Sequence, residues 1–172
     1  MDFINKLTVD RENYLKSLTE RTNVHIKCFN GFENKDVRKL VEIIYRNFEE
    51  LDKYPELNHH RKNILELLKS PNSIIILALH NDKIIGYLIA KKLHNMMHIF
   101  YLFVTPVRRN SSIATHMLNI IQEKTFDKFI NILSITVDTY NNENIKFFVN
   151  NHFTYNDNLR TYKRFDHMVK YV

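Results

Sequence analysis

The 172-residue sequence contains a single cysteine, Cys28, which excludes an internal disulfide bond and is typical of a reducing compartment. Cys28 falls in a strand predicted for residues 24–29, where we expect a buried structural thiol rather than a nucleophile. The chain also lacks any apolar run near the ~20 residues that span a bilayer, and its N-terminal residues lack a signal-peptide core. We therefore expect a soluble cytoplasmic protein with no membrane partner.

Runs of basic residues are absent as well, although the formal net charge is +6. An excess of positive charge favours anionic partners, either nucleic acid or the phosphates of a nucleotide-bearing cofactor. Lysine and arginine are scattered along the chain and never form a run of five. This distribution argues against a nucleic-acid-binding surface and favours the phosphates of a cofactor.

The length fits a single domain, and neither a linker nor a repeat divides the chain. One helical face of residues 1–22 carries the apolar side chains Phe3, Leu7, Tyr14, Leu15 and Leu18. This pattern predicts an N-terminal helical extension ahead of a domain at residues 23–172. The extension packs either on that domain or on a second copy of the chain, which leaves a homodimer open.

Hydrophobic periodicity predicts the elements of the domain. Helices are expected after a cap at Asn34, from Pro55 through Leu68, at 112–125 and at 142–150. Strands are expected at 24–29, 73–80, 83–91, 96–104, 132–139, 153–155 and 164–171. A three-strand meander followed by a βαβ crossover predicts an α/β (α+β) fold, in which helices cover both faces of a mixed, mostly antiparallel, twisted sheet.

Residues 99–121 combine an apolar strand, a basic and serine-rich turn, and an amphipathic helix. Pro106 prevents helical continuation from the strand, and helical spacing begins at Ile113. Ser111 or Ser112 is placed to cap that helix. The start of a helix offers unpaired N–H groups and partial positive charge, which bind phosphate. The segment therefore predicts a diphosphate site, with an ordinary strand-to-helix connection as the alternative.

Residues 109–114, RNSSIA, resemble the acyl-CoA-binding motif of the GNAT superfamily of N-acyltransferases. That motif has Arg or Gln, two residues, Gly, one residue, and then Gly or Ala. Ser112 departs from it, at the glycine that lets the backbone approach the pyrophosphate. The resemblance extends over residues 23–171, with Gly86 at the usual glycine of the third strand and Asn141 at the start of the last helix.

The resemblance implies a sheet that splays between its fourth and fifth strands and binds acetyl-CoA as a co-substrate. It assigns cofactor contacts to the fourth strand, the turn and the last helix: Leu102, Phe103, Val104, Arg108, Arg109, Asn110, Ser111, Ser112, Ile113, Ala114, Thr115, Asn141 and Phe148. The backbone around Phe103 or Val104 is expected to stabilise the oxyanion of the reaction. Capping of the last helix is the alternative role of Asn141.

The residues implied for catalysis are His98 and Tyr140. His98 lies where members of the superfamily often place a Glu or Tyr facing the acceptor amine, and a histidine that titrates near neutrality would act as a base directly or through one water. A histidine hydrogen-bonded within the sheet is the alternative. Phe148 replaces a tyrosine thought to protonate the leaving thiolate, so Tyr140 or Tyr155 is expected to substitute unless both are packing residues.

The acceptor site of this fold is expected between the first two helices of the domain and the last hairpin. Glu49, Glu50 and Asp52 cluster at the end of one of these helices, where they would attract a cationic amine; a solvated face is the alternative. The acceptor is either a lysine or N-terminal amine of a protein or a small amine. No metal site is expected, because the spacing of His94 and His98 on a strand does not form a metal pair.

These patterns predict an acyl-CoA-dependent N-acetyltransferase, in which an amine attacks the thioester directly and no covalent enzyme intermediate forms. The second interpretation is a GNAT-like domain that has lost its chemistry and serves as a CoA-binding or protein-interaction module. Ser112 and Phe148 favour that interpretation. A basic nucleic-acid-binding domain is the third, although no aromatic and basic motif supports it.

Overall fold

The computed structural model describes residues 24–32, 35–156, 158 and 164–172. Its strands are β1 (Val24–Asn30), β2 (Ser73–His80), β3 (Lys83–Leu93), β4 (Met96–Val104), β5 (Ile132–Asp138), β6 (Thr154–Tyr155) and β7 (Phe165–Tyr171). Its helices are α2 (Val37–Asn47), α3 (Arg61–Lys69), α4 (Ile113–Asp127) and α5 (Asn142–Asn150), with the short 3-10 helices η1 (Glu49–Lys53), η2 (Pro55–Leu57) and η3 (Pro106–Arg108). The bounds of β2, β4 and α5 are those predicted from the sequence.

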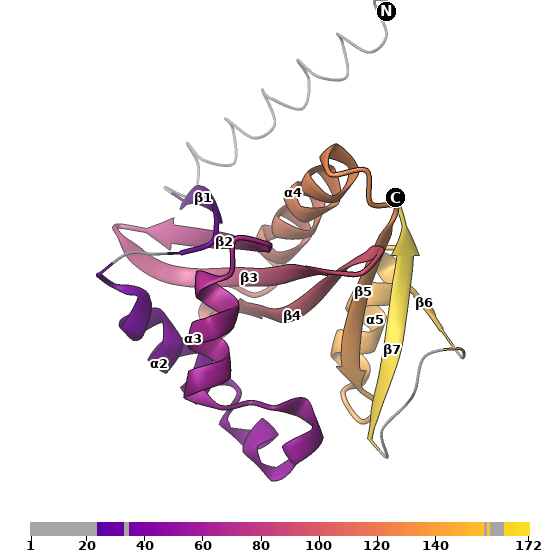
Figure 1. Ribbon diagram of the computed structural model, residues 1–172, viewed down its shortest axis with the longest axis horizontal. Coiled ribbons are helices and arrows are strands. Elements are labelled where there is room, and N and C mark those ends of the chain that lie inside the picture. The colour runs from indigo at the N-terminus through magenta and orange to yellow at the C-terminus, as the bar shows by residue number, and fades with distance from the viewer. Residues whose placement is uncertain (1–23, 33–34, 157, 159–163) are drawn as a thin grey trace, which may run out of the picture.

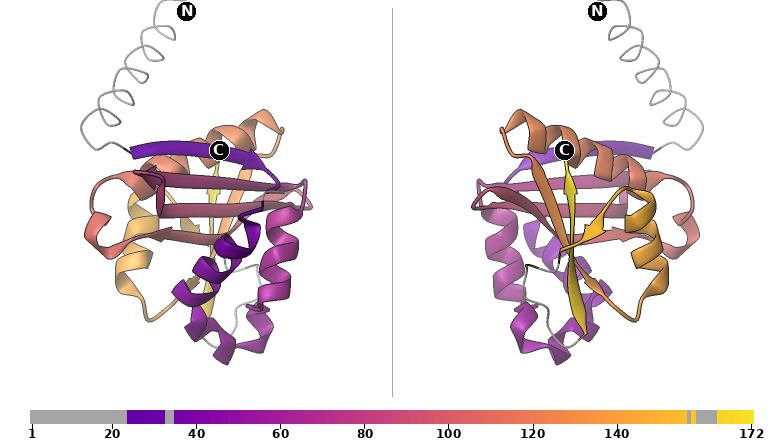
Figure 2. Two further views of the ribbon diagram at one scale, coloured as in Figure 1. Left: turned by 90° about the vertical axis from the view of Figure 1, so that its left-hand side faces the viewer. Right: turned by 90° about the vertical axis from the view of Figure 1, so that its right-hand side faces the viewer.

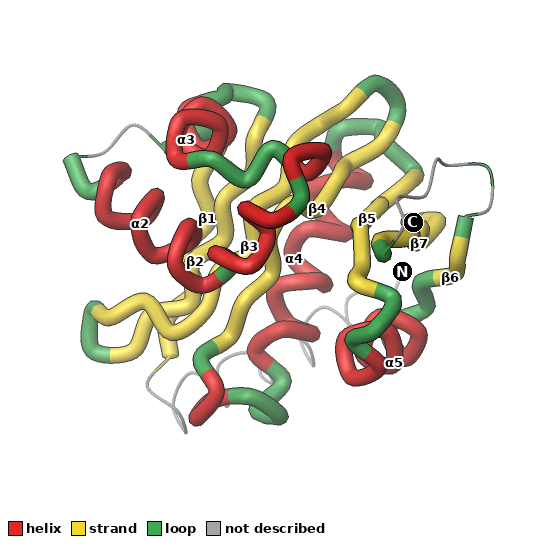
Figure 3. Tube along the Cα trace, turned by 90° about the horizontal axis from the view of Figure 1, so that it is seen from below, coloured by secondary structure: helices red, strands yellow, loops and turns green. Residues whose placement is uncertain are grey.

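The described strands form one sheet in the order β1-β2-β3-β4-β5-β7-β6 (Figure 1). Neighbouring strands are antiparallel except β4 and β5, which are parallel. These two strands pair only where Met97–Ile99 faces Leu133–Ile135, although β4 continues to Val104 and β5 to Asp138. Beyond this pairing they diverge (Figure 3). The predicted mixed sheet with a splay between its fourth and fifth strands is therefore confirmed.

Helices cover both faces of the sheet, α2 and α3 on one and α4 and α5 on the other (Figure 2). Alternation along the strands supplies both cores: Ile76 of β2 packs in the cluster on the α4 side, and Ile75 packs in the cluster with α2 and α3. Helix α2 forms because buried apolar residues recur at helical spacing: Val37, Leu40, Val41 and Ile44. The sheet thus separates two hydrophobic clusters.

The helix expected to begin at Pro55 is divided in two. Pro55 opens a 3-10 helix that ends at Leu57, and Asn58 has a left-handed backbone with a φ of 51°. Helix α3 begins only at Arg61, after the extended His60. Proline fits the first turn of either kind of helix, so it marks a start without fixing how far the helix extends.

Cys28 is exposed, which corrects the expectation of a buried thiol. It lies on β1, one of the two edge strands of the described sheet, where fewer elements cover a side chain. The N-terminal extension expected at residues 1–22 and the cap expected at Asn34 lie outside the described residues. Within the described residues, no helix is long and apolar enough to cross a membrane, and no His, Cys, Asp and Glu side chains gather into a group of three suited to a metal ion.

Replacing Gly86 of β3 by alanine is expected to destabilise the domain. A Cβ at residue 86 would lie 3.0 Å from Phe103 O and 3.4 Å from Val104 Cγ2, so the end of β4 must move. We expect Gly86→Ala to lower the free energy of unfolding by about 1–3 kcal/mol in urea denaturation. Lys83→Ala, at an exposed position of the same strand, should change it by less than about 0.5 kcal/mol. Equal effects of the two substitutions would contradict this account.

Candidate functional site

The turn between β4 and α4 places two residues other than glycine in the left-handed backbone region. Asn110 has a φ of 62°, and Ser112, directly before α4, has a φ of 61°. A side chain in this region costs roughly 1–2 kcal/mol relative to glycine. The backbone at Ser112 therefore has a conformation that glycine favours, adopted here by a serine.

Neither serine of the turn caps α4, contrary to the sequence-based expectation. Ser112 makes no side-chain hydrogen bond to the helix, and its Oγ donates to Ser111 O at 2.6 Å. Ser111 Oγ donates to Arg108 O. A capping residue normally has an extended backbone, whereas Ser112 is left-handed, so its hydroxyl bonds to the preceding carbonyl instead. Both hydroxyl groups therefore brace the turn and leave the helix amides to other acceptors.

The first turn of α4 presents backbone donors next to this turn. The N–H of His116 donates to Ser112 O at 2.9 Å. The N–H groups of Ile113, Ala114 and Thr115 come before that bond and have no acceptor within the helix. Such groups, together with the partial positive charge of a helix N-terminus, attract anions. This end of α4 can therefore bind a phosphate through consecutive amides.

Two arginines lie within five residues of the start of α4. Arg109 Nε donates to Val104 O at 3.2 Å, which anchors its guanidinium to the end of β4. Arg108 is partly buried in η3, and its backbone N–H donates to Thr105 O at 2.8 Å. Their charges add to the positive potential of the helix end.

The direction of the β4 backbone groups follows from its pairing with β3. Thr105 N–H donates to Ile85 O at 2.8 Å, and hydrogen-bonded pairs alternate with non-bonded pairs along antiparallel strands. Phe103 therefore directs its N–H toward β3, while Leu102 and Val104 direct theirs toward the splay, where β5 does not pair. The buried Thr105 hydroxyl also makes no hydrogen bond to any described residue.

His98 lies on β4 at the closed end of the splay, where it pairs with Ser134 of β5. Its Nδ1 is 2.8 Å from Ser134 Oγ, and its ring lies edge-on to Phe100, with ring centroids 4.8 Å apart. Burial lowers the pKa of His98 to about 4, and the neighbouring His167 acts in the same direction. The expectation that His98 titrates near neutrality is therefore wrong, and its ring is uncharged at pH 7.

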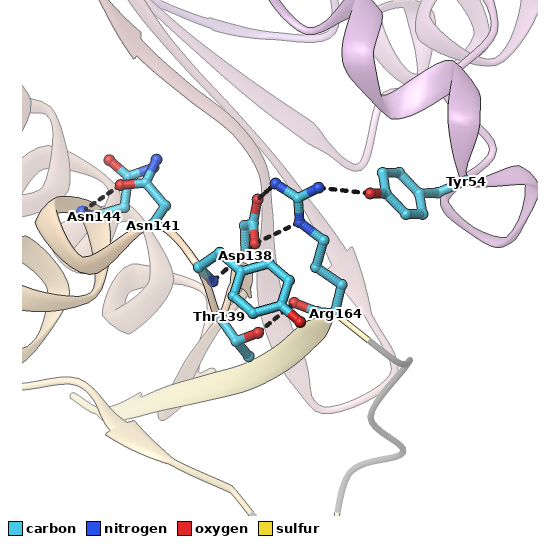
Figure 4. A network of polar contacts seen from close by, with 7 residues as sticks. Tyr54, Asp138, Thr139, Asn141, Asn144 and Arg164 are labelled. Atoms are coloured by element: carbon cyan, nitrogen blue, oxygen red, sulfur yellow. Dashed lines mark hydrogen bonds and ion pairs between the residues drawn. The ribbon is translucent and has the colours of Figure 1, made fainter.

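Helix α5 begins as expected, and its residues of interest have structural partners. Asn141 caps the helix, because its Oδ1 accepts a hydrogen bond from Asn144 N–H at 3.0 Å (Figure 4). Phe148 is buried, with ring centroids 5.2 Å from Phe147 and 5.3 Å from Phe153. The capping role stated as the alternative for Asn141 is thus present in the structure.

The acidic residues expected near the acceptor lie in η1 and not at the end of α2. Carboxylates at the C-terminal end of a helix would oppose the helix dipole, but α2 ends at Asn47, before these residues. Glu49 and Glu50 are exposed. Asp52 accepts a hydrogen bond from Tyr45 OH and lies 4.0 Å from His60 Nδ1. Two carboxylates of the cluster therefore face solvent, while the third has protein partners.

A polar network that sequence reasoning missed joins three distant segments (Figure 4). Arg164, directly before β7, donates to the Asp138 carboxylate at 2.9 and 2.6 Å and to Tyr54 OH at 2.7 Å. The guanidinium lies 5.2 Å from the centre of the Tyr140 ring, whose side chain is 75% exposed. The hydrogen bonds from Arg164 lower the pKa of Asp138. No local pattern marks these residues, because 110 positions separate Tyr54 from Arg164.

Comparisons with known proteins find the same fold in solved structures of acetyltransferases. PaiA N-acetyltransferase from Thermoplasma acidophilum, solved in complex with coenzyme A, is 16% identical, with a TM-score of 0.67 over 86% of this chain and 99% of that chain. A GNAT-family acetyltransferase from Staphylococcus aureus is 17% identical, with a TM-score of 0.65 over 86% and 99% of the two chains. NAA60 from Arabidopsis thaliana, solved with a bisubstrate analogue, is 16% identical, with a TM-score of 0.63 over 86% and 98%.

At these identities the solved structures show a shared fold. No curated protein sequence matches the chain significantly. The model of the acetyltransferase (GNAT) family matches residues 36–153, which include β4, the turn, α4 and α5. The match spans more than half of the chain and all of the splay described above. The chain therefore belongs to the acetyltransferase (GNAT) family.

Proposed function

We propose that the protein is an N-acetyltransferase that moves an acetyl group from acetyl-CoA to a primary amine. The observation that carries the proposal is the splay between β4 and β5, placed next to open amides at the start of α4. The amides suit a diphosphate and the splay suits a slender arm that ends in a thioester, and acetyl-CoA contains both groups. Family membership, and solved structures that hold coenzyme A or a bisubstrate analogue, support it.

The diphosphate is proposed to bind the amides of residues 113–115, with Arg108 and Arg109 beside them. The pantetheine arm would follow β4 like an added strand and bond to the backbone of Leu102 and Val104. The oxyanion that forms on the thioester carbonyl would accept a hydrogen bond from a β4 amide beside His98, where the opening starts, because Leu102 and Val104 lie about 13–20 Å along the strand from His98. Phe103 does not have this role, because its N–H faces β3.

The reaction begins when a neutral amine attacks the thioester carbon. The new C–N bond forms, the C–S bond breaks, and the proton lost by the amine ends on the thiolate. An alkylammonium of pKa ~10.4 is neutral in roughly one molecule per thousand at pH 7, which costs ~4–5 kcal/mol. With a pKa of about 4, His98 is too weak a base to hold the proton of the ammonium.

We propose that His98 orients the amine or its water instead of storing the proton. In the tautomer that this role requires, Nδ1 of His98 donates to Ser134 Oγ, 2.8 Å away, and the Ser134 hydroxyl donates on to Met96 Sδ at 3.3 Å. The other ring nitrogen, Nε2, then carries a lone pair. A neutral imidazole in this state accepts a hydrogen bond from the attacking amine or from a water that removes its proton.

The remaining roles are proposed for exposed residues. Phe148 cannot protonate the leaving thiolate, and Tyr140, at the start of α5, is the proposed donor. Glu49 and Glu50 would attract the cationic amine from solvent. The acceptor is either a protein amine or a small amine.

A CoA-binding module without activity is the second candidate function. The buried Phe148 and the left-handed Ser112 favour it.

Thiol release from acetyl-CoA with a panel of amines separates these two functions. We expect free thiol only when an amine is added, in an amount equal to the acetylated amine found by mass spectrometry. Tyr140→Phe should lower kcat by about 10- to 100-fold through loss of the proton donor, while the control Tyr171→Phe should not. Saturable binding of acetyl-CoA without thiol release for any amine would contradict the transferase.

Substitution of Ser112 tests the cofactor turn. Ser112→Gly removes the cost of a left-handed serine and opens the approach to the amides, so we expect acetyl-CoA to bind about two- to tenfold more tightly in calorimetry. Ser112→Val should weaken binding, because a β-branched residue resists this backbone. Lys128→Gly, past the other end of α4, serves as the control. Weaker binding by Ser112→Gly would argue against a diphosphate at this turn.

Acid should destabilise the fold through His98. Its pKa is about 4 when folded and about 6.5 in an unfolded chain, so the unfolded state binds more protons between these values. The contribution of neutral His98 to the free energy of unfolding is therefore complete above about pH 6.5. It falls by about 3 kcal/mol as the pH drops toward 4. Urea denaturation at pH 7 and pH 4 measures this loss. Between these two pH values, the free energy of unfolding should fall by about 2–3 kcal/mol less in His98→Gln than in wild type. The exposed control His94→Gln should follow wild type, and identical losses in all three proteins would refute this.

A further inference from the structure

The edge strand β1 lies at the rim of the sheet, on the face that carries α4 (Figure 2). Helix α4 packs mainly against β2, β3, β4 and β5. Val24 of β1 is buried in the cluster on this face, Ile26 is only partly buried, and Cys28, which alternation directs to the same face, is exposed. Helices pack about 8–10 Å apart and strands lie about 4.8 Å apart, so the place for a second helix beside α4 is over β1.

One flank of α4 faces the uncovered side of β1. Neighbouring atoms shield the Cys28 thiol from part of its water and raise its pKa, while the ammonium of Lys124 acts in the opposite direction. Lys124 of α4 is therefore near the thiol. Ile120 lies one turn earlier on the same flank and is partly buried against the cluster. We call this surface the notch: Ile26 and Cys28 form its floor, and Ile120 and Lys124 form its wall.

Both elements of the notch run in the same direction. Strands β1 to β4 are antiparallel to their neighbours, so β1 runs opposite to β4. Helix α4 connects β4 to the parallel strand β5 and also runs opposite to β4. Ile26 pairs with Ala78 and Ala78 with Gly86, where an added Cβ would lie 3.5 Å from Met117 Cε, in the first half of α4. The start of β1 is therefore at the end of the notch where α4 begins.

The chain ahead of β1 reaches the notch at that end. Residues 1–22 lie outside the described residues, and their sequence predicts an amphipathic helix. Its apolar face carries Phe3, Leu7, Tyr14, Leu15 and Leu18. A helix of these 22 residues would be ~33 Å long, whereas α4, with 15 residues, is ~22 Å long. A segment that turns back ahead of β1 can therefore follow the notch over its whole length.

We propose that residues 1–22 fold back ahead of Val24 as a helix antiparallel to α4 and pack their apolar face into the notch of the same chain. Packing there would bury the apolar stripe and cover an edge strand, as natural sheets commonly do with a helix. A short connection gives the segment an effective concentration on the order of millimolar, which favours it over a second copy. The docked helix would cover the Cys28 thiol. This inference does not rest on the proposed function.

Cys28 reports on the notch, because it is the only cysteine of the chain. The described residues leave it exposed, so slow labelling of the native full-length chain requires something that covers it. We expect N-ethylmaleimide to label wild type slowly and Leu18→Glu at least about tenfold faster, because loss of one buried leucine shifts a docking equilibrium by that much. Asn13→Glu adds the same charge on the polar face of the helix and should label like wild type.

Light scattering on the same samples identifies the occupant. A monomer mass, with protection of wild type that persists on dilution, supports docking within one chain. A dimer mass for the protected protein would overturn this proposal in favour of a second copy. Equal labelling rates in wild type, Leu18→Glu and Asn13→Glu would overturn the covered notch altogether. Circular dichroism verifies the fold of each variant, and Leu15→Glu repeats the test at a second position. None of these outcomes bears on the transferase, which the thiol-release assay tests separately.

Discussion

The parallel pairing of β4 with β5 ends after Ile99 and Ile135, and the rest of the site depends on that short ladder. A longer ladder would pair the outward amides of Leu102 and Val104 and leave no space for a slender ligand. Because the strands part instead, these backbone groups need another partner, and an unpaired buried backbone group is costly. The opening is therefore both the entrance for a ligand and a set of hydrogen-bonding groups that a ligand can satisfy.

The two ends of the opening differ in chemistry. On one side of the sheet, the turn before α4 gathers helix amides and the charges of Arg108 and Arg109, which suit an anion. On the other side, His98 is uncharged and the charges of Asp138 and Arg164 cancel. This asymmetry matches a reaction between a polyanionic donor and an amine that must be neutral when it attacks.

Local sequence patterns were enough to predict most helices and strands, but not the burial and contacts that each side chain has in the fold. Helix α5 and β4 match the sequence because capping by Asn141 and the break at Pro106 are local events. The continuous helix from Pro55 is wrong because a left-handed Asn58 has no reliable sequence signal. The pKa of His98 depends on burial by neighbouring strands, which local spacing cannot give. The N-terminal helix remains a prediction.

Nuclear magnetic resonance on the ¹⁵N-labelled chain, titrated with acetyl-CoA, tests the central claim most directly. The account predicts saturable shifts of the backbone amides of Ile113, Ala114 and Thr115, which would bind the diphosphate, and of Leu102 and Val104, which line the splay. Absence of saturable binding, or saturation that leaves these amides unmoved while others shift, would contradict it.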